Sequence, residues 1–370
     1  MIRKIGTFFK KDLIFTIAVG LALLSMLLVP PHAGYLDYID FRVLCILFSL
    51  MCVVAGFQKC GLLTAVSQRL LTAAHTLRGL SLLLVILCFL SSMLLTNDVT
   101  LIAFVPLTLV MLQTVHPFRR IYLIVLETVA ANLGSMLTPI GNPQNLYLYT
   151  HYNMSIGPFL RTVAPVWLFS LLLVLGLVWI GKNQPVIWIP RPVSLDRFRL
   201  ALYLAFFLIC CLTVLRVVDY WLCMLLILAM LLAFDRPVLR RIDYRLIGTF
   251  AAFFIVVGNL GSLEPVREAM ARWLPGRELW TTVLVSQVSS NVPAAILLSR
   301  FTLNGDALLL GSNLGGLGSL VASLASLISY KWYVQSPEAK PLRYLGVFTL
   351  VNVGMLVVLG AFVYGMGCLR

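Results

Sequence analysis

The amino-acid sequence predicts an all-α polytopic membrane protein, in which about nine transmembrane helices and two re-entrant hairpins form an inverted-topology repeat. Three observations carry this prediction. Of the 370 residues, 61% are hydrophobic and only 11% are charged, with a mean hydropathy of +0.98, whereas a soluble domain has about 25% charged residues. The apolar residues form long runs separated by basic connections. Three blocks of sequence also recur in the same order in both halves of the chain.

The net charge of +14 has two interpretations. It could reflect binding to a nucleic acid, or it could reflect the tendency of Lys and Arg to collect in the cytoplasmic loops of membrane proteins. We favour the second interpretation and expect no nucleic-acid partner, because the basic residues fall between the apolar runs. With the N-terminus in the cytoplasm, 20 of the 28 Lys and Arg residues lie on the cytoplasmic side and 8 on the outer side.

Nine apolar runs are predicted to cross the hydrocarbon core of a bilayer, which is roughly 30 Å thick. The first ends at Pro30-Pro31 without a small-residue cleavage site, so we interpret it as a retained span and not as a signal peptide. The predicted spans are 13–29, 41–57, 121–149, 163–180, 200–215, 219–234, 246–262, 307–330 and 344–368.

Two further apolar segments are predicted to fold back as re-entrant hairpins. As one straight helix, 79–115 would be about 55 Å long, so it must turn at its polar centre "LLTNDVT" (94–100). Segment 279–301 has legs of about 11 residues on either side of "SSNVP", and each leg reaches only about 16 Å. If this segment crossed the bilayer fully, the Lys-bearing loop 331–343 would fall outside the cell, against the charge rule.

The internal repeat is visible in three aligned blocks. "ANLGSMLTPIG" (131–141) aligns with "SNLGGLGSLVA" (312–322), and "TND" (96–98) aligns with "SNV" (290–292). Further upstream, "VVAGFQKCGLL" (53–63) aligns with "VVGNLGSLEPV" (256–266). The first hairpin is expected to enter from the cytoplasm and the second from outside. One integral membrane domain would then contain two units of opposite orientation, 1–199 and 200–370, an arrangement typical of secondary transporters.

The predicted site lies where hairpin tips and glycine-broken helices leave backbone groups unpaired. Helix N-termini there can hold an anion, while carbonyl, Asn, Thr and Ser oxygens can hold a small cation. A single glycine in a membrane helix usually marks close packing, but the repeated cluster of Gly and Asn favours a binding site. The predicted substrate- or ion-binding residues are Thr96, Asn97, Asp98, Thr100, Asn132, Thr138, Gly141, Asn142, Ser289, Ser290, Asn291, Asn313, Gly315, Gly316 and Ser319.

Two carboxylates, Asp98 and Glu127, are predicted at membrane depth, and each aligns with an apolar residue in the second unit. An ionisable group inside a membrane marks a functional site by default. Burial favours the protonated form of a carboxyl, so both are candidates for proton coupling. The alternatives are a helix cap for Asp98 and a structural hydrogen bond to a neighbouring helix for Glu127.

The sequence contains no motif for metal binding, phosphate binding or enzymatic catalysis. The eight cysteines and four histidines lack metal-ligand spacing, and the sequence contains no phosphate-binding loop, HExxH or nucleophile elbow. We therefore expect no enzyme activity, no metal and no cofactor, apart from Na⁺ or H⁺ as a coupling ion.

The segments "NDVTLIAFVPL", "TPIGNPQNLYL" and "SSNVPAAILLS" resemble the ion transporter superfamily. The likeness is to its permease branch of arsenite permeases and NhaD-type sodium/proton antiporters, often labelled citrate-transporter-like, and it covers about residues 40 to 330. It implies a rigid scaffold and a mobile transport unit that moves like an elevator. The related divalent-anion/sodium symporters carry a Ser-Asn-Thr triplet at each hairpin tip. Here the triplets are Thr96-Asn97-Asp98 and Ser290-Asn291-Val292, a departure that argues against a sodium-coupled dicarboxylate.

The function predicted from the sequence is secondary active transport of a small inorganic or organic anion across the inner (cytoplasmic) membrane, coupled to an ion gradient. One alternative is an NhaD-type sodium/proton antiporter. An alternative of another class is a membrane sensor or assembly protein that does not transport. The partners are a small molecule or ion and the lipid bilayer. A homodimer stays open, because related transporters are often dimers and the sequence identifies no interface.

Overall fold

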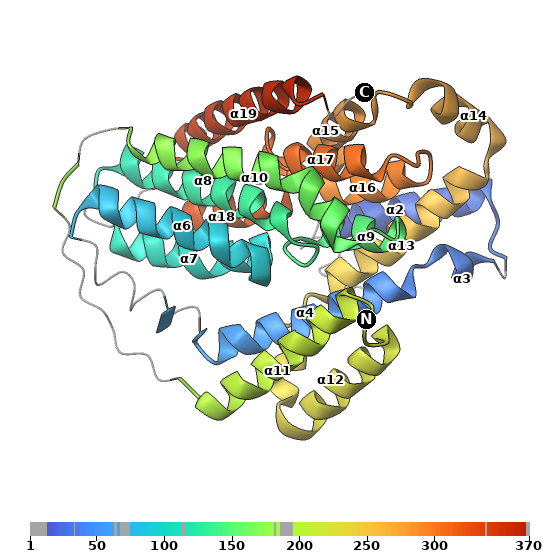
Figure 1. Ribbon diagram of the computed structural model, residues 1–370, viewed down its shortest axis with the longest axis horizontal. Helices are drawn as coiled ribbons and strands as arrows, with labels where there is room; N and C mark the ends of the chain where they lie inside the picture. The colour runs from blue at the N-terminus through green and yellow to red at the C-terminus, as the bar shows by residue number, and fades with distance from the viewer. Residues whose placement is uncertain are drawn as a thin grey trace.

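A computed structural model describes residues 13–32, 34–62, 65–66, 75–112, 115–180, 183–185, 195–336 and 339–367 (Figure 1). Within these ranges the regular structure is helical, apart from an isolated bridge between Thr76 and Pro185. Seven described helices are long and apolar enough to cross a membrane, and three more are shorter but apolar. The prediction of an all-α polytopic membrane protein is confirmed, while the number of spans stays a prediction.

The helix bounds follow the predicted spans closely. The first half of the chain contains α2 (Leu13–Leu28), α3 (Tyr35–Tyr38), α4 (Phe41–Lys59), α6 (Leu77–Leu95), α7 (Asn97–Met111), α8 (Pro117–Gly134), η1 (Ser135–Leu137), α9 (Pro143–His151) and α10 (Ile156–Val178). The second half contains α11 (Arg197–Val214), α12 (Tyr220–Phe234), η2 (Arg236–Arg241), α13 (Tyr244–Ser262), α14 (Glu264–Trp273), α15 (Glu278–Ser289), α16 (Asn291–Ser299), α17 (Gly305–Gly315), η3 (Leu320–Ala322), α18 (Leu324–Val334) and α19 (Pro341–Gly365).

Polar residues before the apolar runs explain where several helices begin. The side chains of Thr76, Asp196, Asp219 and Asp243 accept hydrogen bonds from the first free backbone N–H groups of α6, α11, α12 and α13. Such N-caps satisfy donors that have no partner inside the helix. The short acidic or hydroxyl-bearing connections of the sequence therefore set the helix boundaries.

Each predicted hairpin turns at a single residue. Thr96 separates α6 from α7 with φ 68° and ψ 151°, and Ser290 separates α15 from α16 with φ 77° and ψ 155°. Positive φ is unfavourable for residues other than glycine, and a β-branched residue such as Thr is a clear outlier. The two tips thus share one strained backbone conformation, of the kind that collects at functional sites.

The two predicted broken spans are interrupted where the sequence has its glycine clusters. The run 121–149 is divided into α8, η1 and α9, and the run 307–330 into α17, η3 and α18. The connectors are held to the hairpins in the same way in both halves. The Thr138 hydroxyl donates to the Met93 carbonyl, and the Ser319 hydroxyl donates to the Gln287 carbonyl at 2.9 Å.

Close backbone contact between α6 and α8 depends on Gly134. A Cβ atom there would overlap the carbonyl oxygen of Phe89 and press on Ser92 Oγ. We expect Gly134→Ala to lower the free energy of unfolding by about 1–3 kcal/mol, as overpacking does in a close-packed interior, and to lower the melting temperature of the purified protein. Gly176→Ala on α10 is the control, because a Cβ there meets nothing within 4 Å. Equal melting temperatures for the two variants would contradict this contact.

A second group of helices lies beside the hairpins and broken helices. Figure 1 shows α4, α11 and α12 together along one side of the molecule, and α13 packs against α2. One end of this group is held by buried Asp235, which bonds Lys59 of α4 and, at 2.9 Å, the hydroxyl of Tyr203 on α11. Burial alone would raise the pKa of Asp235, but the bonds from Lys59 and Tyr203 outweigh it and lower the pKa below its usual value.

Several predictions fall on residues outside the described ranges. Of the 20 basic residues predicted on the cytoplasmic side, these are Arg3, Lys4, Lys10, Lys11, Arg69, Lys182 and Arg191. Of the 8 predicted on the outer side, Arg370 is one such residue. Among the described cysteines all seven are free, and no cluster of three or more His, Cys, Asp or Glu residues occurs in the described part of the chain.

Candidate functional site

The predicted asparagines gather where the two broken helices cross. Asn132, near the end of α8, lies against the start of α18. Asn313, near the end of α17, lies against the start of α9. Each broken helix of the predicted repeat therefore places one Asn at the start of the second half-helix of the other. The asparagines are 2–4% exposed, so these polar contacts are almost fully shielded.

The Asn132 side of this cluster is built from amides and hydroxyls. Asn132 Oδ1 accepts a bond from the Nδ2 of Asn97 at 3.0 Å and another from the Ser323 hydroxyl at 3.0 Å. Its own Nδ2 donates to the hydroxyl of Ser326 at 3.3 Å. The first hairpin tip, α8 and α18 are therefore joined through one side chain.

The Asn313 side mirrors this arrangement with amides in place of hydroxyls. Asn142 Nδ2 donates to Asn313 Oδ1 at 3.0 Å, and Asn313 Nδ2 donates to Asn145 Oδ1 at 2.7 Å. Asn142 also caps α9 by accepting the Asn145 N–H at 2.9 Å. The Nδ2 of Asn145 donates to the carbonyls of Met136 and Thr138, which fixes the connector around η1.

The residues of the two sides correspond in sequence. Asn142 and Asn145 follow Asn132 by the same intervals by which Ser323 and Ser326 follow Asn313. Sequence reasoning missed Asn145, Ser323 and Ser326 as members of the cluster. Extending the alignment four residues beyond Gly141 and Ala322 pairs all of them, so the signal was present in the chain.

The second hairpin tip reaches the same region through the side chains of Ser290 and Asn291. The Ser290 hydroxyl donates to the Ala322 carbonyl at 3.4 Å, and a Cβ on Gly316 would come within 2.9 Å of Asn291 Nδ2. Each hairpin also packs against the broken helix of the other half of the chain, because α7 packs against α18 and α16 packs against α9. The N-termini of α7, α16, α9 and α18 therefore face one small region that both units build.

The other residues predicted to bind substrate lie around this region, and several of them have structural contacts. Thr100 is fully buried on α7, one turn after the tip, and its hydroxyl oxygen has no hydrogen-bond partner. A Cβ on Gly141 would overlap the Ser135 carbonyl, so this glycine allows the tight connector. Gly315 lies against Ser286 of α15, and the Ser289 hydroxyl bonds the Val285 carbonyl within its own helix at 3.0 Å. The hydroxyls of Thr138 and Ser319 bond hairpin carbonyls, as described above.

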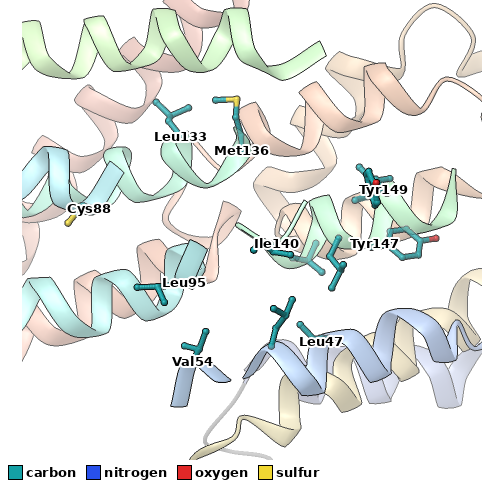
Figure 2. Packing of buried hydrophobic residues seen from close by; sticks show 14 of the residues in the cluster. Leu47, Val54, Cys88, Leu95, Leu133, Met136, Ile140, Tyr147 and Tyr149 are labelled. Atoms are coloured by element: carbon teal, nitrogen blue, oxygen red, sulfur yellow. The ribbon is translucent and has the colours of Figure 1, made fainter. Parts of the chain in front are cut away.

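A cavity of about 160 Å³ opens beside the first hairpin tip. Thr96, Asp98 and Asn142 contribute polar groups to its lining, and α4 contributes five apolar side chains and Gln58. Figure 2 shows Leu47 and Val54 of α4 facing the region of Ile140 and Leu95. Arg241, the last residue of η2, and Asp243, the N-cap of α13, also line the cavity, at the end where Lys59 and Asp235 pair.

A second cavity of about 200 Å³ lies at the opposite end of α4 and α13. Its polar lining includes Asp37, Asp40, His151 and Arg300, and it contains none of the predicted binding residues. Of these two cavities, formed by described residues, the first reaches a hairpin tip.

Glu127 lies away from both cavities. It is fully buried on α8, where its Oε1 accepts a hydrogen bond from the Thr108 hydroxyl of α7 and its Oε2 has no partner. The neighbouring Thr128 hydroxyl bonds Ser329 of α18 at 2.6 Å, and Ser329 bonds the Tyr344 hydroxyl at 3.0 Å. The two predicted carboxylates thus have different settings, with Asp98 on a cavity wall and Glu127 inside a dry helix interface.

Comparison with known proteins decides the family. The chain matches the citrate transporter family model over residues 5–325. The chain belongs to this family. The family match confirms the resemblance to citrate-transporter-like members of the ion transporter superfamily and covers most of the sequence.

Named relatives agree with the family. An uncharacterized transporter of Methanocaldococcus jannaschii is 29% identical over 361 residues, which cover 97% of this chain and 98% of that protein. Inner membrane protein YbiR of Escherichia coli is 33% identical over 307 residues, covering 79% of this chain and 80% of that protein. A silicon efflux transporter of rice is 29% identical over 145 residues, covering 38% of this chain and 30% of that protein. The chain is therefore a multi-pass membrane transporter, and these names point away from an enzyme.

Proposed function

We propose that the protein is a secondary active transporter of a small anion in the inner membrane, driven by an ion gradient. The observation that supports this best is the reciprocal asparagine cluster, whose hydrogen bonds join the starts of α7, α9 and α18 to Asn132 and Asn313. The substrate would bind between this cluster and the cavity that contains Thr96, Asp98 and Asn142.

The electrostatics of helix ends favour an anion at this site. Each of α7, α9, α16 and α18 is nine residues or longer and has partial positive charge at its first turn. Some of the first-turn donors are already used, because the Asp98 N–H bonds Asn97 Oδ1 and the Asn145 N–H bonds Asn142 Oδ1. The remaining donors can hold an anion without a basic side chain. Among the described residues that line the cavity, Arg241 is the single basic side chain, and Asp98 and Asp243 are acidic. A small anion of low charge therefore fits the lining better than a multiply charged one.

The proposed mechanism is elevator-type alternating access. The group of α2, α4, α11, α12 and α13 would form the scaffold, and the hairpins with the broken helices would form the moving unit. The cavity that reaches the first hairpin tip opens at the end rich in Arg and Lys, which the charge rule assigns to the cytoplasm. This conformation would accordingly be the one that is open to the cytoplasm.

The proposed inverted topology has a direct test. In a variant whose eight native cysteines are replaced, Ser336→Cys should react with a membrane-impermeant thiol reagent only from the cytoplasmic side, and Asp306→Cys only from outside. Ser336 follows α18, and Asp306 lies in the exposed first turn of α17. Labelling of both positions from the same side would exclude two units of opposite orientation.

A sodium/proton antiporter is the second candidate function, and Asp98 is the observation that favours it. This carboxylate lies on the cavity wall next to the hydroxyl-bearing tip residue Thr96. Carboxylate, hydroxyl and amide oxygens are also the ligands that a hard cation prefers. The same region could then hold Na⁺ in place of, or together with, an anion.

A thermal-shift screen of the purified protein separates these candidates. A ligand that binds only the folded state raises the melting temperature by mass action. The screen includes citrate and silicate, because of the family name and the rice relative, other small anions, and Na⁺ against K⁺. We expect a saturable shift with a small anion that disappears in Asn97→Ala. A shift with Na⁺ alone would favour the antiporter, and no shift with any ion would remove the proposed site.

A further inference from the structure

A groove lined by two arginines lies far from the asparagine cluster, where α6 and α8 begin and α10 ends. Arg78 stands in the first turn of α6 and Arg119 in the first turn of α8, and both line the groove. The Arg119 guanidinium donates to the carbonyl of Ile180, just beyond α10. The guanidinium carbon of Arg78 lies 4.8 Å from the ring centre of Trp179. Three helix ends therefore hold two cationic groups at one place.

The chain beyond α10 folds back onto this groove and fixes its shape. The backbone N–H of Leu77 donates to the Gln184 carbonyl at 2.8 Å, and that of Arg78 donates to Asn183 Oδ1 at 3.0 Å. These two hydrogen bonds hold the backbone of Leu77 and Arg78 in place, and thereby the position of Arg78. The shape of the groove therefore depends on hydrogen bonds of the backbone as well as on side-chain rotamers.

The charge of the groove selects an anion. Its described lining contains two arginines and no acidic residue. Both arginines stand at the N-terminal ends of helices, where the partial charge is also positive. Arginine is well suited to phosphate, because its planar guanidinium can donate two parallel hydrogen bonds.

The size and surroundings of the groove indicate a lipid and not a soluble metabolite. Its hollow measures about 20 Å³, close to the space of one water molecule, so most of any ligand must lie outside it. Leu168, Leu172 and Trp179 form an exposed stripe along α10 that leads away from the groove, with exposed fractions of 54%, 60% and 60%. Exposed Trp at helix ends is typical of the membrane interface, and Trp179 lies directly after α10.

We propose that this groove binds the phosphate of an anionic phospholipid, whose acyl chains lie along the stripe of α10. Arg78 and Arg119 would contact the headgroup, and Val178 and Leu123 would line the entry to the apolar part. Basic pockets between membrane helices on the cytoplasmic side are a known physical route to anionic headgroups. The proposal does not depend on the identity of the transported ion.

The test uses the full-length protein in detergent, titrated with phosphatidylglycerol or with phosphatidylcholine of the same acyl chains. Melting temperature and native mass spectrometry report binding, and inorganic phosphate and glycerol 3-phosphate are added in separate titrations. The double variant Arg78→Gln/Arg119→Gln removes both cations. The control Arg236→Gln/Arg240→Gln makes the same charge change at exposed positions of η2, outside the groove. If the first double variant does not fold, Arg119→Gln alone is measured.

We expect phosphatidylglycerol to bind more tightly than phosphatidylcholine. The groove variant should weaken this binding about thirtyfold, since each basic residue contributes to anionic-lipid attraction, and the control should change it less than twofold. Equal loss in the control would show general charge attraction and overturn the site. A melting shift of the same size with inorganic phosphate or glycerol 3-phosphate would show a soluble phosphate site and overturn the lipid assignment. Equal affinity for the two lipids would overturn both.

Discussion

Replacing either hairpin-tip asparagine, by Asn97→Ala or Asn291→Ala, is expected to reduce transport in reconstituted vesicles by about tenfold to hundredfold. Each loss of a hydrogen bond to a charged ligand costs about 1.5–3 kcal/mol, and Asn97 also orients Asn132 through the bond from its Nδ2. Both asparagines begin a helix at a strained tip. Expression and melting temperature should stay close to those of the unmodified protein, because Asn132 Oδ1 keeps the hydrogen bond from the Ser323 hydroxyl when Asn97 is replaced.

Asn352→Ala is the matched control for these variants. Asn352 is fully buried on α19, and its Nδ2 donates to the Phe348 carbonyl one turn before it. It shares residue type and burial with the tip asparagines but has no place in the cluster. Transport should change less than twofold in this variant. If Asn97→Ala and Asn291→Ala both moved substrate at the unmodified rate, the binding site would have to lie elsewhere.

Asn132→Ala is expected to reduce transport more than the tip variants do, but the cause of the reduction would be harder to assign. Asn132→Ala would leave Asn97 Nδ2 and the Ser323 hydroxyl without their acceptor in a buried region. An unsatisfied buried polar group costs about 1–3 kcal/mol, so loss of folding and loss of binding would be mixed. The tip variants separate the two, and for this reason they are the sharper test.

The sequence predicted the hairpin turns and the helix breaks because these depend on local composition. A polar tip inside an apolar run and a glycine cluster inside a span each have only a few structural solutions in a membrane. The turns at Thr96 and Ser290 and the breaks after Gly134 and Gly315 lie where those features occur. The fold class and its main elements therefore follow from the chain alone.

The pairing of side chains across the site could not be predicted in the same way. That Asn313 meets Asn142 and Asn145 depends on how the two units cross, and this is a tertiary property. The apolar wall that α4 gives to the cavity also has no chemical signature in the sequence. The residues Thr138 and Ser319, predicted to bind substrate, have hydroxyls that hold the connectors to the hairpins.

Asp98→Asn is expected to stop proton-driven accumulation of substrate while leaving some downhill exchange. Asp98 lines the cavity, and its counterpart in the second unit is Val292, so only one unit places a carboxyl at its tip. A carboxyl whose surroundings alternate between dry protein and water can bind a proton in one state and release it in the other. The substitution keeps shape and hydrogen bonding but removes this cycle. The measurement is uptake into vesicles with and without an imposed pH gradient.

Two further variants make this experiment decisive. Asp306→Asn is the control, because Asp306 is also an acidic residue in the first turn of a helix but lies exposed on α17, bonded to Thr162, and accumulation should persist there. Glu127→Gln tests the other carboxyl predicted for proton coupling, which is fully buried and whose Oε2 has no partner. If Glu127→Gln alone stops accumulation, the proton carrier is Glu127 and Asp98 serves another role. If Asp98→Asn instead loses a sodium-induced melting shift, Asp98 is a cation ligand and the antiporter is favoured. Normal accumulation and unchanged ion responses in Asp98→Asn would leave Asp98 as a residue that only stabilises the start of α7.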